Sequence, residues 1–250
     1  MDLVYGPIQS LRYGSTLGIN LLGKAKVCSY NCIYCHLGAS ELTMNRIRKE
    51  YEFPSLEQIK TEFRNYIKKS VTSDAIVISG NGEPTLYPQF YEAAQLIHEL
   101  RNEHLPGTKI VILSNGAHLD SKKVVTGMNL MDERVIKVDA GNDIVMQKIN
   151  EPLVRINMIK FLGGVRKLKN IVVQSLFVGG PNHNTAPEVI DDWIEVLGMI
   201  QPSSVQLCTV TRPSFMPSVV AVEDDVLYGI AFKLKKRTSL ESHVFVSKKS

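Results

Sequence analysis

Short runs of apolar residues, many of them β-branched, recur along the chain and alternate with segments of helical periodicity. Runs this short and this continuously apolar are typical of strands buried on both faces of a parallel sheet, which helices connect. The six runs are 17–22, 75–80, 109–116, 134–141, 170–177 and 204–210. Six repeats are too few for the usual eightfold closure. The pattern therefore predicts an α/β fold with an open or partial barrel.

Segments with helical periodicity lie between and after these runs. They are 55–70, 89–102, 122–131, 143–150, 155–168, 187–200 and 225–236, with a short strand expected at 244–246. Ser55 is placed to cap the first helix, and Gln58 three residues later completes a capping box. The apolar side chains of that helix share one face, which consists of Ile59, Phe63, Tyr66 and Ile67. This face is expected to pack against the sheet.

The two ends of the chain fall outside the repeats. Residues 5–14 are rich in turn formers, so a turn-rich connection is expected there rather than a strand. No linker rich in proline, glycine or serine divides the sequence, and 250 residues suit one large α/β domain. We therefore expect one domain over 1–250, with the barrel at about 15–213 and the helix and strand of 214–250 covering it.

Three cysteines lie close together just after the first apolar run. Cys28, Cys32 and Cys35 form a C-x3-C-x2-C pattern, with Tyr34 before the last cysteine. A 4Fe–4S cubane has one ligand per iron, so three thiolates leave the fourth iron open to an outside ligand. Structural zinc usually takes four ligands from two separated pairs, and His36 is poorly placed as a fourth because it adjoins Cys35. The run favours an iron–sulfur cluster, with a structural zinc site as the alternative.

The remaining cysteine bears on the cellular compartment. Cys208 stands alone within the apolar run 204–210, where a buried thiol is expected, so no disulfide framework is available. No apolar run reaches membrane-spanning length, and the chain start lacks a basic-then-apolar signal pattern. The expected location is the cytoplasm, without membrane attachment.

A second motif follows the run 75–80. Gly82, Glu83 and Pro84 come between that strand and the next helix. Glycine lets the backbone approach a ligand closely, and a carboxylate can accept hydrogen bonds from an ammonium group. The alternative interpretation is a Gly/Pro turn that carries a solvated glutamate.

Polar residues also end the later strands. Because reactive groups collect at the carboxyl ends of parallel barrel strands, these residues are candidates for ligand binding. They are Ser114, Asn115, Asp139, Gln174 and Arg212. Asn-Gly and Asp-x-Gly are also ordinary turn formers, and an arginine before a proline can be a surface residue. If it faces the site, Arg212 can bind a carboxylate in a bidentate contact.

The cysteine run with its aromatic residue, together with the Gly-Glu-Pro loop, resembles the signature of the radical S-adenosylmethionine (radical SAM) enzymes. That resemblance implies a (βα)6 partial barrel, a 4Fe–4S cluster and S-adenosylmethionine (SAM) on the open iron. One-electron cleavage of SAM then yields a 5′-deoxyadenosyl radical. The family's Gly-Gly-Glu-Pro motif holds the SAM amino group, and here Asn81 replaces its first glycine.

The resemblance also assigns roles to the strand-end residues. It implies that they contact the ribose, the adenine, the methionine carboxylate or the substrate, with Tyr34 flanking the adenine ring. The implied SAM-binding set is Tyr34, Gly82, Glu83, Pro84, Ser114, Asn115, Asp139, Gln174 and Arg212. The implied cluster ligands are Cys28, Cys32 and Cys35.

Further phrases are similar to the wyosine-base synthases, radical SAM proteins that modify a guanosine in phenylalanine tRNA. They are 6–12, 17–20, 79–86, 148–152, 179–182 and 206–213. Those synthases carry a second cluster on three upstream cysteines, whereas this chain has no cysteine before Cys28. Neither Lys24 nor Lys26 can be matched to the lysine that holds pyruvate in that group.

Several function classes remain open. The first is an oxidoreductase-type radical SAM enzyme that acts on a small molecule. The second is a tRNA-modifying enzyme, with which a net charge of +4 and a pI near 8.8 are compatible. A glycyl-radical activating enzyme, with a protein substrate, and a structural metal-binding module are further alternatives. Each radical SAM hypothesis requires a low-potential electron donor of the flavodoxin or ferredoxin type. Cleavage of the sulfonium demands the low end of the range of cubane potentials, which extends down to about −700 mV.

Overall fold

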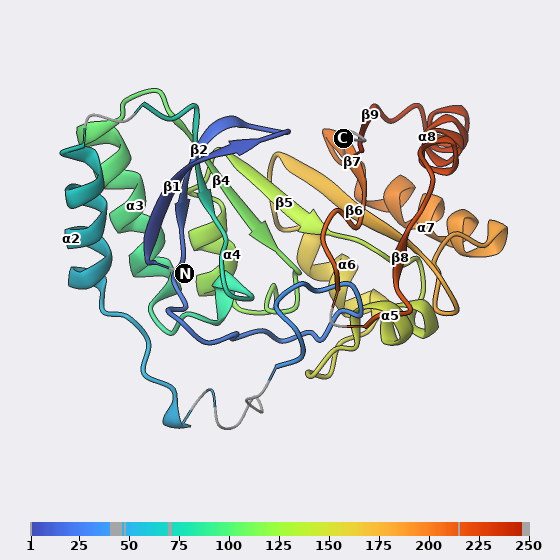
Figure 1. Ribbon diagram of the computed structural model, residues 1–250, viewed down its shortest axis with the longest axis horizontal. Helices are drawn as coiled ribbons and strands as arrows, with labels where there is room; N and C mark the ends of the chain where they lie inside the picture. The colour runs from blue at the N-terminus through green and yellow to red at the C-terminus, as the bar shows by residue number, and fades with distance from the viewer. Residues whose placement is uncertain (1, 41–46, 48, 70–71, 215, 247–250) are drawn as a thin grey trace.

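A curled sheet with helices outside it makes up the computed structural model, which describes residues 2–40, 47, 49–69, 72–214 and 216–246 (Figure 1). In this part of the chain the sheet order is β1-β2-β3-β4-β5-β6-β7-β9, and β8 pairs with β6. The strands are β1 (Val4–Ser10), β2 (Gly14–Ile19), β3 (Ala75–Ile78), β4 (Lys109–Ser114), β5 (Glu133–Lys137), β6 (Ile171–Gly179), β7 (Ser204–Thr209), β8 (Val220–Ala221) and β9 (Ser242–Phe245).

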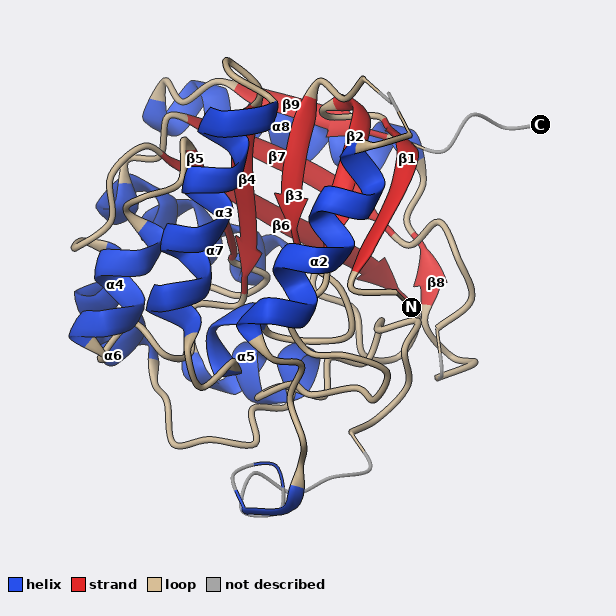
Figure 2. Cartoon of the chain, turned by 90° about the vertical axis from the view of Figure 1, so that its left-hand side faces the viewer, coloured by secondary structure: helices blue, strands red, loops and turns tan. Residues whose placement is uncertain are grey.

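Helices follow most of the strands and cover the outer side of the sheet, as Figure 2 shows for α2 and α3. They are α2 (Leu56–Ile67), η1 (Pro84–Leu86), α3 (Phe90–His104), α4 (Lys122–Met128), α5 (Asp143–Asn150), α6 (Met158–Val165), α7 (Pro187–Ile200) and α8 (Asp224–Thr238). The capping box of Ser55 and Gln58 is confirmed. Ser70, the predicted end of that helix, lies outside the described residues. No helix in the described ranges is long and apolar enough to cross a membrane.

The strands from β2 to β7 pair in parallel with their sequence neighbours, which confirms the partial (βα)6 barrel. One register row runs through Leu17, Ile76 and Ile110 on the first three of these strands. All three side chains are fully buried. On the opposite face of these strands Ala75 and Val111 are also buried, so the continuous apolar runs reflect strands that are covered on both faces.

The amino-terminal prediction was wrong. Residues 4–10 form strand β1, antiparallel to β2, where a turn-rich connection was expected. Most of β1 is exposed and it contains Gly6 and Pro7, so it lacks an apolar pattern; an edge strand tolerates such residues. The first parallel strand also ends earlier than predicted, at Ile19. Leu21 and Leu22 extended the apolar run because they are buried, but they lie in the loop after β2.

The last strand extends the sheet. β9 pairs in parallel with β7, so that Val205 lies beside Ser242 and Cys208 beside Phe245. The expected strand at 244–246 therefore exists two residues earlier, at the edge opposite β1. Of the segment 214–250, residues 215 and 247–250 lie outside the described ranges.

The sheet has two different faces. The outer face carries large aliphatic side chains that join the main core under the helices, among them Ile112, Ile136 and Leu207. The other face, which we call the inner face, carries a separate small cluster of Ala75, Val111, Val135 and Val172. Because side chains alternate along a strand, the residues two positions further along β5 and β6 also belong to the inner face.

Candidate functional site

The cysteine loop, residues 27–38, follows β2 and is fixed on one side by the loop after β3. Val27 N–H donates to the carbonyl of Asn81 at 2.8 Å, and Glu83 N–H donates to the carbonyl of Val27 at 2.9 Å. Between these bonds Gly82 has a φ of +136°, and a Cβ there would lie 1.9 Å from the Val27 oxygen. Only glycine permits this approach of the two loops.

Asn81, which stands where the related motif has glycine, has a structural task of its own. Its side-chain amide donates to the carbonyls of Gly23 at 2.8 Å and Lys24 at 3.1 Å. These carbonyls belong to the segment that leads into the cysteine loop. The departure from the family pattern thus ties the two loops together.

The end of α5 fixes the loop on its other side. Asn31 N–H donates to the backbone carbonyl of Glu151 at 3.1 Å, and Ile33 N–H donates to the backbone carbonyl of Ile149 at 3.0 Å. Leu153 N–H donates back to the carbonyl of Ser29 at 2.8 Å. The cysteine loop is therefore held by backbone bonds between two segments that are distant in sequence.

All three thiols of the loop are half-buried and free of disulfides. Burial raises the pKa of Cys28 to about 12 and that of Cys32 to about 11. Two amides point at these sulfurs: Asn150 Nδ2 lies 3.4 Å from Cys32 Sγ, and Asn115 Nδ2 lies 3.8 Å from Cys28 Sγ. A bound cationic centre reverses such a rise in pKa, because it stabilises the thiolates.

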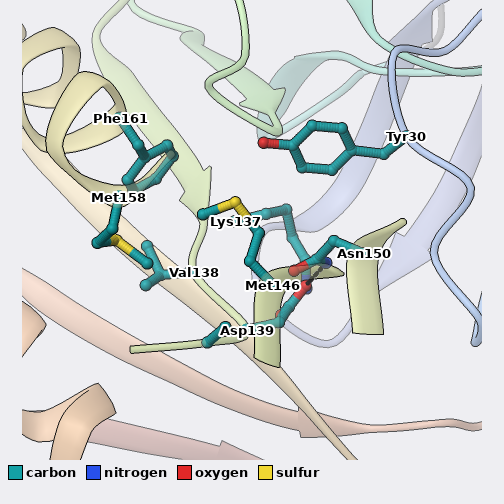
Figure 3. A pocket seen from close by; sticks show the side chains of 9 residues that line it. Tyr30, Lys137, Val138, Asp139, Met146, Asn150, Met158 and Phe161 are labelled. Atoms are coloured by element: carbon teal, nitrogen blue, oxygen red, sulfur yellow. Dashed lines mark hydrogen bonds and ion pairs between the residues drawn. The ribbon is translucent and has the colours of Figure 1, made fainter. Parts of the chain in front are cut away.

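The donor set fits an iron–sulfur cubane, in which three thiolates from one loop each bind a different iron. Among the described residues, no three His, Cys, Asp or Glu side chains are arranged around a point where one metal ion could sit. A further sign of a ligand lies beside the loop, where the buried Tyr30 hydroxyl has no hydrogen-bond partner within the described ranges. It borders a small pocket together with Lys137, Asp139 and Asn150 (Figure 3).

Glu83 is buried, with 2% of its surface exposed, and joins the end of β4 to the loop after β3. Its Oε1 accepts from Thr85 Oγ1 at 2.6 Å, Thr85 N at 3.1 Å and Ser114 Oγ at 2.8 Å. Its Oε2 accepts from Asn115 N at 2.7 Å and from no other donor among the residues that the structure describes. A carboxylate oxygen has two lone pairs, so Oε2 can accept one more donor.

Asp139 is the centre of a second buried network. Its Oδ1 accepts from Leu176 N at 2.8 Å and pairs with Lys137 Nζ at 3.1 Å. Its Oδ2 accepts from Asn150 Nδ2 at 2.8 Å and from the Tyr34 hydroxyl. Lys137 Nζ also lies 5.3 Å from the centroid of the Tyr34 ring, as a cation–π contact. With four donors the carboxylate is saturated.

The structure brings most of the predicted residues together around Glu83 and Asp139, whereas Gln174 and Arg212 lie outside these two networks. Ser114 and Asn115 bond Glu83, while Tyr34 bonds Asp139. Pro84 opens η1, which Glu83 caps. Gln174 lies on β6 and bonds Gln206 at 3.0 Å. Arg212 is exposed, and its charge lowers the pKa of His36, next to the cysteine run, although burial is the larger cause.

Sequence reasoning missed three contributors, namely Lys137, Asn150 and Ser29. Asn150 lies in the phrase 148–152, which the resemblance had singled out, and that was the available signal. Ser29 lies within the cysteine run and accepts from Asn115 Nδ2 at 3.1 Å. Nothing in the pattern marked Lys137, because a lysine at the end of a strand usually faces solvent.

Comparison with known proteins agrees with this geometry. The family described as Radical SAM superfamily matches residues 24–194. A UPF0026 protein of Helicobacter pylori strain J99 is 30% identical over 260 residues, covering 99% of this chain and 80% of that protein. A Brachyspira hyodysenteriae protein named GTPase Obg is 30% identical over 244 residues. This match covers 96% of the chain but only 35% of that protein, so the chain spans about a third of its length.

Among solved structures, "TYW1 with a lysine-pyruvate adduct bound" has a TM-score of 0.66 and 17% sequence identity. The similarity covers 90% of this chain and 74% of that one. At this level of identity the likeness concerns the fold, which is the partial barrel described above.

Proposed function

The chain belongs to the radical SAM superfamily, whose members are enzymes that use SAM and an iron–sulfur cluster, and on this premise we propose that it cleaves SAM reductively. Cys28, Cys32 and Cys35 would hold a 4Fe–4S cluster whose open iron takes SAM. When bound, the cluster supplies the electron that splits the sulfonium into methionine and a 5′-deoxyadenosyl radical. The radical would then remove hydrogen from the substrate.

The buried Glu83 carboxylate carries this proposal. Thr85 and Ser114 saturate its Oε1, while Oε2 retains a free lone pair beside the cysteine loop. A charged acceptor held rigid in a dry site suits an ammonium group such as that of methionine. Gly82 and Pro84 fix the backbone on either side, and Asn115 links Glu83 to Cys28.

The other candidate residues take narrower roles. Tyr34 would flank the adenine ring, with its hydroxyl fixed by Asp139. Asp139 would act as the residue that orients Tyr34, Lys137 and Asn150, since a ribose hydroxyl could bond it only by displacing one of four donors. Gln174 would contact the substrate on the inner face, and Arg212 would reach a carboxylate from the exposed side.

We further propose that 1–250 acts as one domain in the cytoplasm, with its barrel at 15–213, and receives electrons from a flavodoxin- or ferredoxin-type donor. Modification of tRNA is the second candidate. It is favoured by the phrases shared with the wyosine-base synthases and by the exposed Arg212 beside the cysteine loop. This candidate predicts tRNA binding that weakens steeply with salt.

Anaerobic reconstitution with iron and sulfide, followed by reduction in the presence of SAM, tests the main proposal. We expect 5′-deoxyadenosine, lost in Cys32→Ala and retained in Cys208→Ala, a control that removes a thiol outside the loop. A chain that binds stoichiometric zinc and never cleaves SAM would instead be a structural metal-binding module. Addition of tRNA or of a candidate glycyl-radical protein to the active enzyme then tests the remaining classes.

A further inference from the structure

The tip of the β1–β2 hairpin reaches across the inner face to the far edge of the sheet. Arg12 Nη1 lies 3.4 Å from Cys208 Sγ on β7, and the guanidinium lies 5.7 Å from the centroid of the Phe245 ring on β9. Next to it, Tyr13 bonds Glu133 on β5 and accepts from Gln206 Nε2 at 3.3 Å. The hairpin tip therefore places a cation against the strands of the opposite half of the sheet.

Arg12 has no carboxylate partner among the described residues. Its neighbours there are a thiol and an aromatic ring, and neither carries a negative charge. Of the carboxylates on this face, Glu133 is engaged by Tyr13 and by Lys109 at 3.3 Å. Asp139 is saturated by its four donors. The inner face thus carries an excess of positive charge at Arg12.

Lys137 supplies a second cation on the same face. It lies two residues after Val135 on β5, and 18% of its side chain is exposed. Its one carboxylate partner, Asp139, is shared with three other donors. Through the register of β5, β6 and β7, Lys137 lies in the same row as Gln206, and Cys208 follows two residues later on the same face of β7. Arg12 contacts that thiol, so both cations border this part of the inner face. Burial raises the pKa of Cys208, and the charges of Lys137 and Arg12 act against that rise.

A row of amides continues from Lys137 across the sheet. Lys137, Gln174 and Gln206 are register neighbours on β5, β6 and β7. Gln174 is only 8% exposed and donates one hydrogen bond, to Gln206 Oε1 at 3.0 Å. Its amide oxygen and second N–H have no protein partner in the part of the chain that the structure describes, and the oxygen is not sealed from solvent. The second N–H can therefore donate to a ligand on the inner face.

We propose that the inner face binds an anionic group of the substrate, a carboxylate or a phosphate, between Arg12 and Lys137, with Gln174 as a neutral contact. The substrate class is then a small organic acid or a phosphorylated metabolite. Arginine and lysine both suit such anions, since each forms charge-assisted hydrogen bonds with them. This inference rests on the proposed function, because it names the substrate of the same site.

Binding of inorganic phosphate and of succinate, with neutral succinamide as the control ligand, tests the inference directly. Ligand-observed NMR titrations of the purified chain, with and without a reconstituted cluster, would compare wild type, Arg12→Gln and Arg155→Gln. Arg155 is an exposed arginine after α5 and serves as the matched change of charge. We expect saturable anion binding in wild type and Arg155→Gln, weakened about tenfold or more in Arg12→Gln. The tighter of the two anions identifies the group.

Equal affinities of Arg12→Gln and Arg155→Gln, or no saturable binding of either anion by wild type, would overturn the inference. Binding of tRNA without either small anion would also overturn it and would support the second candidate function. Arg12 is exposed on a turn, so the variant should fold, and Lys137→Gln provides a second test of the same site. No reductant is used, so a failure of SAM cleavage bears on the proposed function alone, and a failure of anion binding bears on this inference alone.

Discussion

The two faces of the sheet are built from the same strands but for different purposes. On β6, Val173 and Phe177 point outward into the main core, while Gln174 points inward. On β7, Val205 and Leu207 face outward, and Gln206 faces inward. The outer face is mainly apolar and stabilises the fold, whereas the inner face also carries a row of amides and charges. If the inner face binds the substrate as proposed, the alternation of side chains along one strand separates stability from ligand binding.

Trp193→Ala, which changes the packing on the outer face of the sheet, should have the largest effect on stability. The indole is 1% exposed, packs edge-on against Phe177 and donates to Ser175 Oγ at 2.9 Å. Its removal should lower the free energy of unfolding by about 3–5 kcal/mol, measured by denaturant titration. A loss below about 1 kcal/mol would mean that the outer face is not the main source of stability.

Gly82→Ala should produce the next largest effect, at the contact between the loop after β3 and the cysteine loop. The new Cβ would collide with the Val27 carbonyl, and the positive φ adds strain of about 1–3 kcal/mol. We expect a clear loss of bound iron and sulfide after reconstitution. Gly163→Ala is the control, since a Cβ there has open space within α6. Equal cluster content in both variants would show that the two loops are not mutually dependent.

Asn150→Leu should change the midpoint potential of the reconstituted cluster rather than the stability of the fold. The amide donates towards Cys32 Sγ, and such bonds stabilise the more negative, reduced cluster. The midpoint potential, followed by EPR during a redox titration, should therefore move to a more negative value. Asn102→Leu, at an exposed position of α3, should leave it unchanged. An unchanged midpoint potential in Asn150→Leu would mean that Asn150 does not act on the cluster and only holds Asp139.

The smallest effect is expected for a paired change on the inner face. Replacing Gln174 and Gln206 together by leucine removes both partners of their mutual hydrogen bond. The Tyr13 hydroxyl also loses Gln206 Nε2 but keeps its bond to Glu133. The free energy of unfolding should change by less than about 1 kcal/mol, while either single substitution should cost about 1 kcal/mol or more. If the double variant were as unstable as Trp193→Ala, the two faces would contribute equally and the contrast would fail.

The parallel strands could be predicted because their apolar runs leave little choice of environment. Strand β1 could not, since Gly6 and Pro7 read as turn formers and its pairing depends on β2 rather than on its own pattern. Helix α5 was predicted with its observed bounds, Asp143–Asn150, because Asn142 caps it and the apolar period is regular. Edge elements and strand ends depend on tertiary contacts, which a local pattern does not encode.

The candidate site divides in the same way. The cysteines and Glu83 were visible as motifs because their chemistry requires a fixed spacing within one loop. Apart from Lys137, the partners of Asp139 come from three separate segments, namely the cysteine loop, α5 and β6, so their convergence appears only in the folded chain. Arg12 is the extreme case, since its contact with Cys208 spans almost the whole sequence.

The hairpin that carries Arg12 stands outside the repeating strand–helix units, and this separation has a consequence for how such a protein can diversify. In the described ranges the turn makes no backbone bond to the cysteine loop, and Tyr13 ties it to the sheet through Glu133 and Gln206. If Arg12 binds the substrate as proposed, exchanging that residue alone would alter substrate preference while the cysteine loop keeps its contacts.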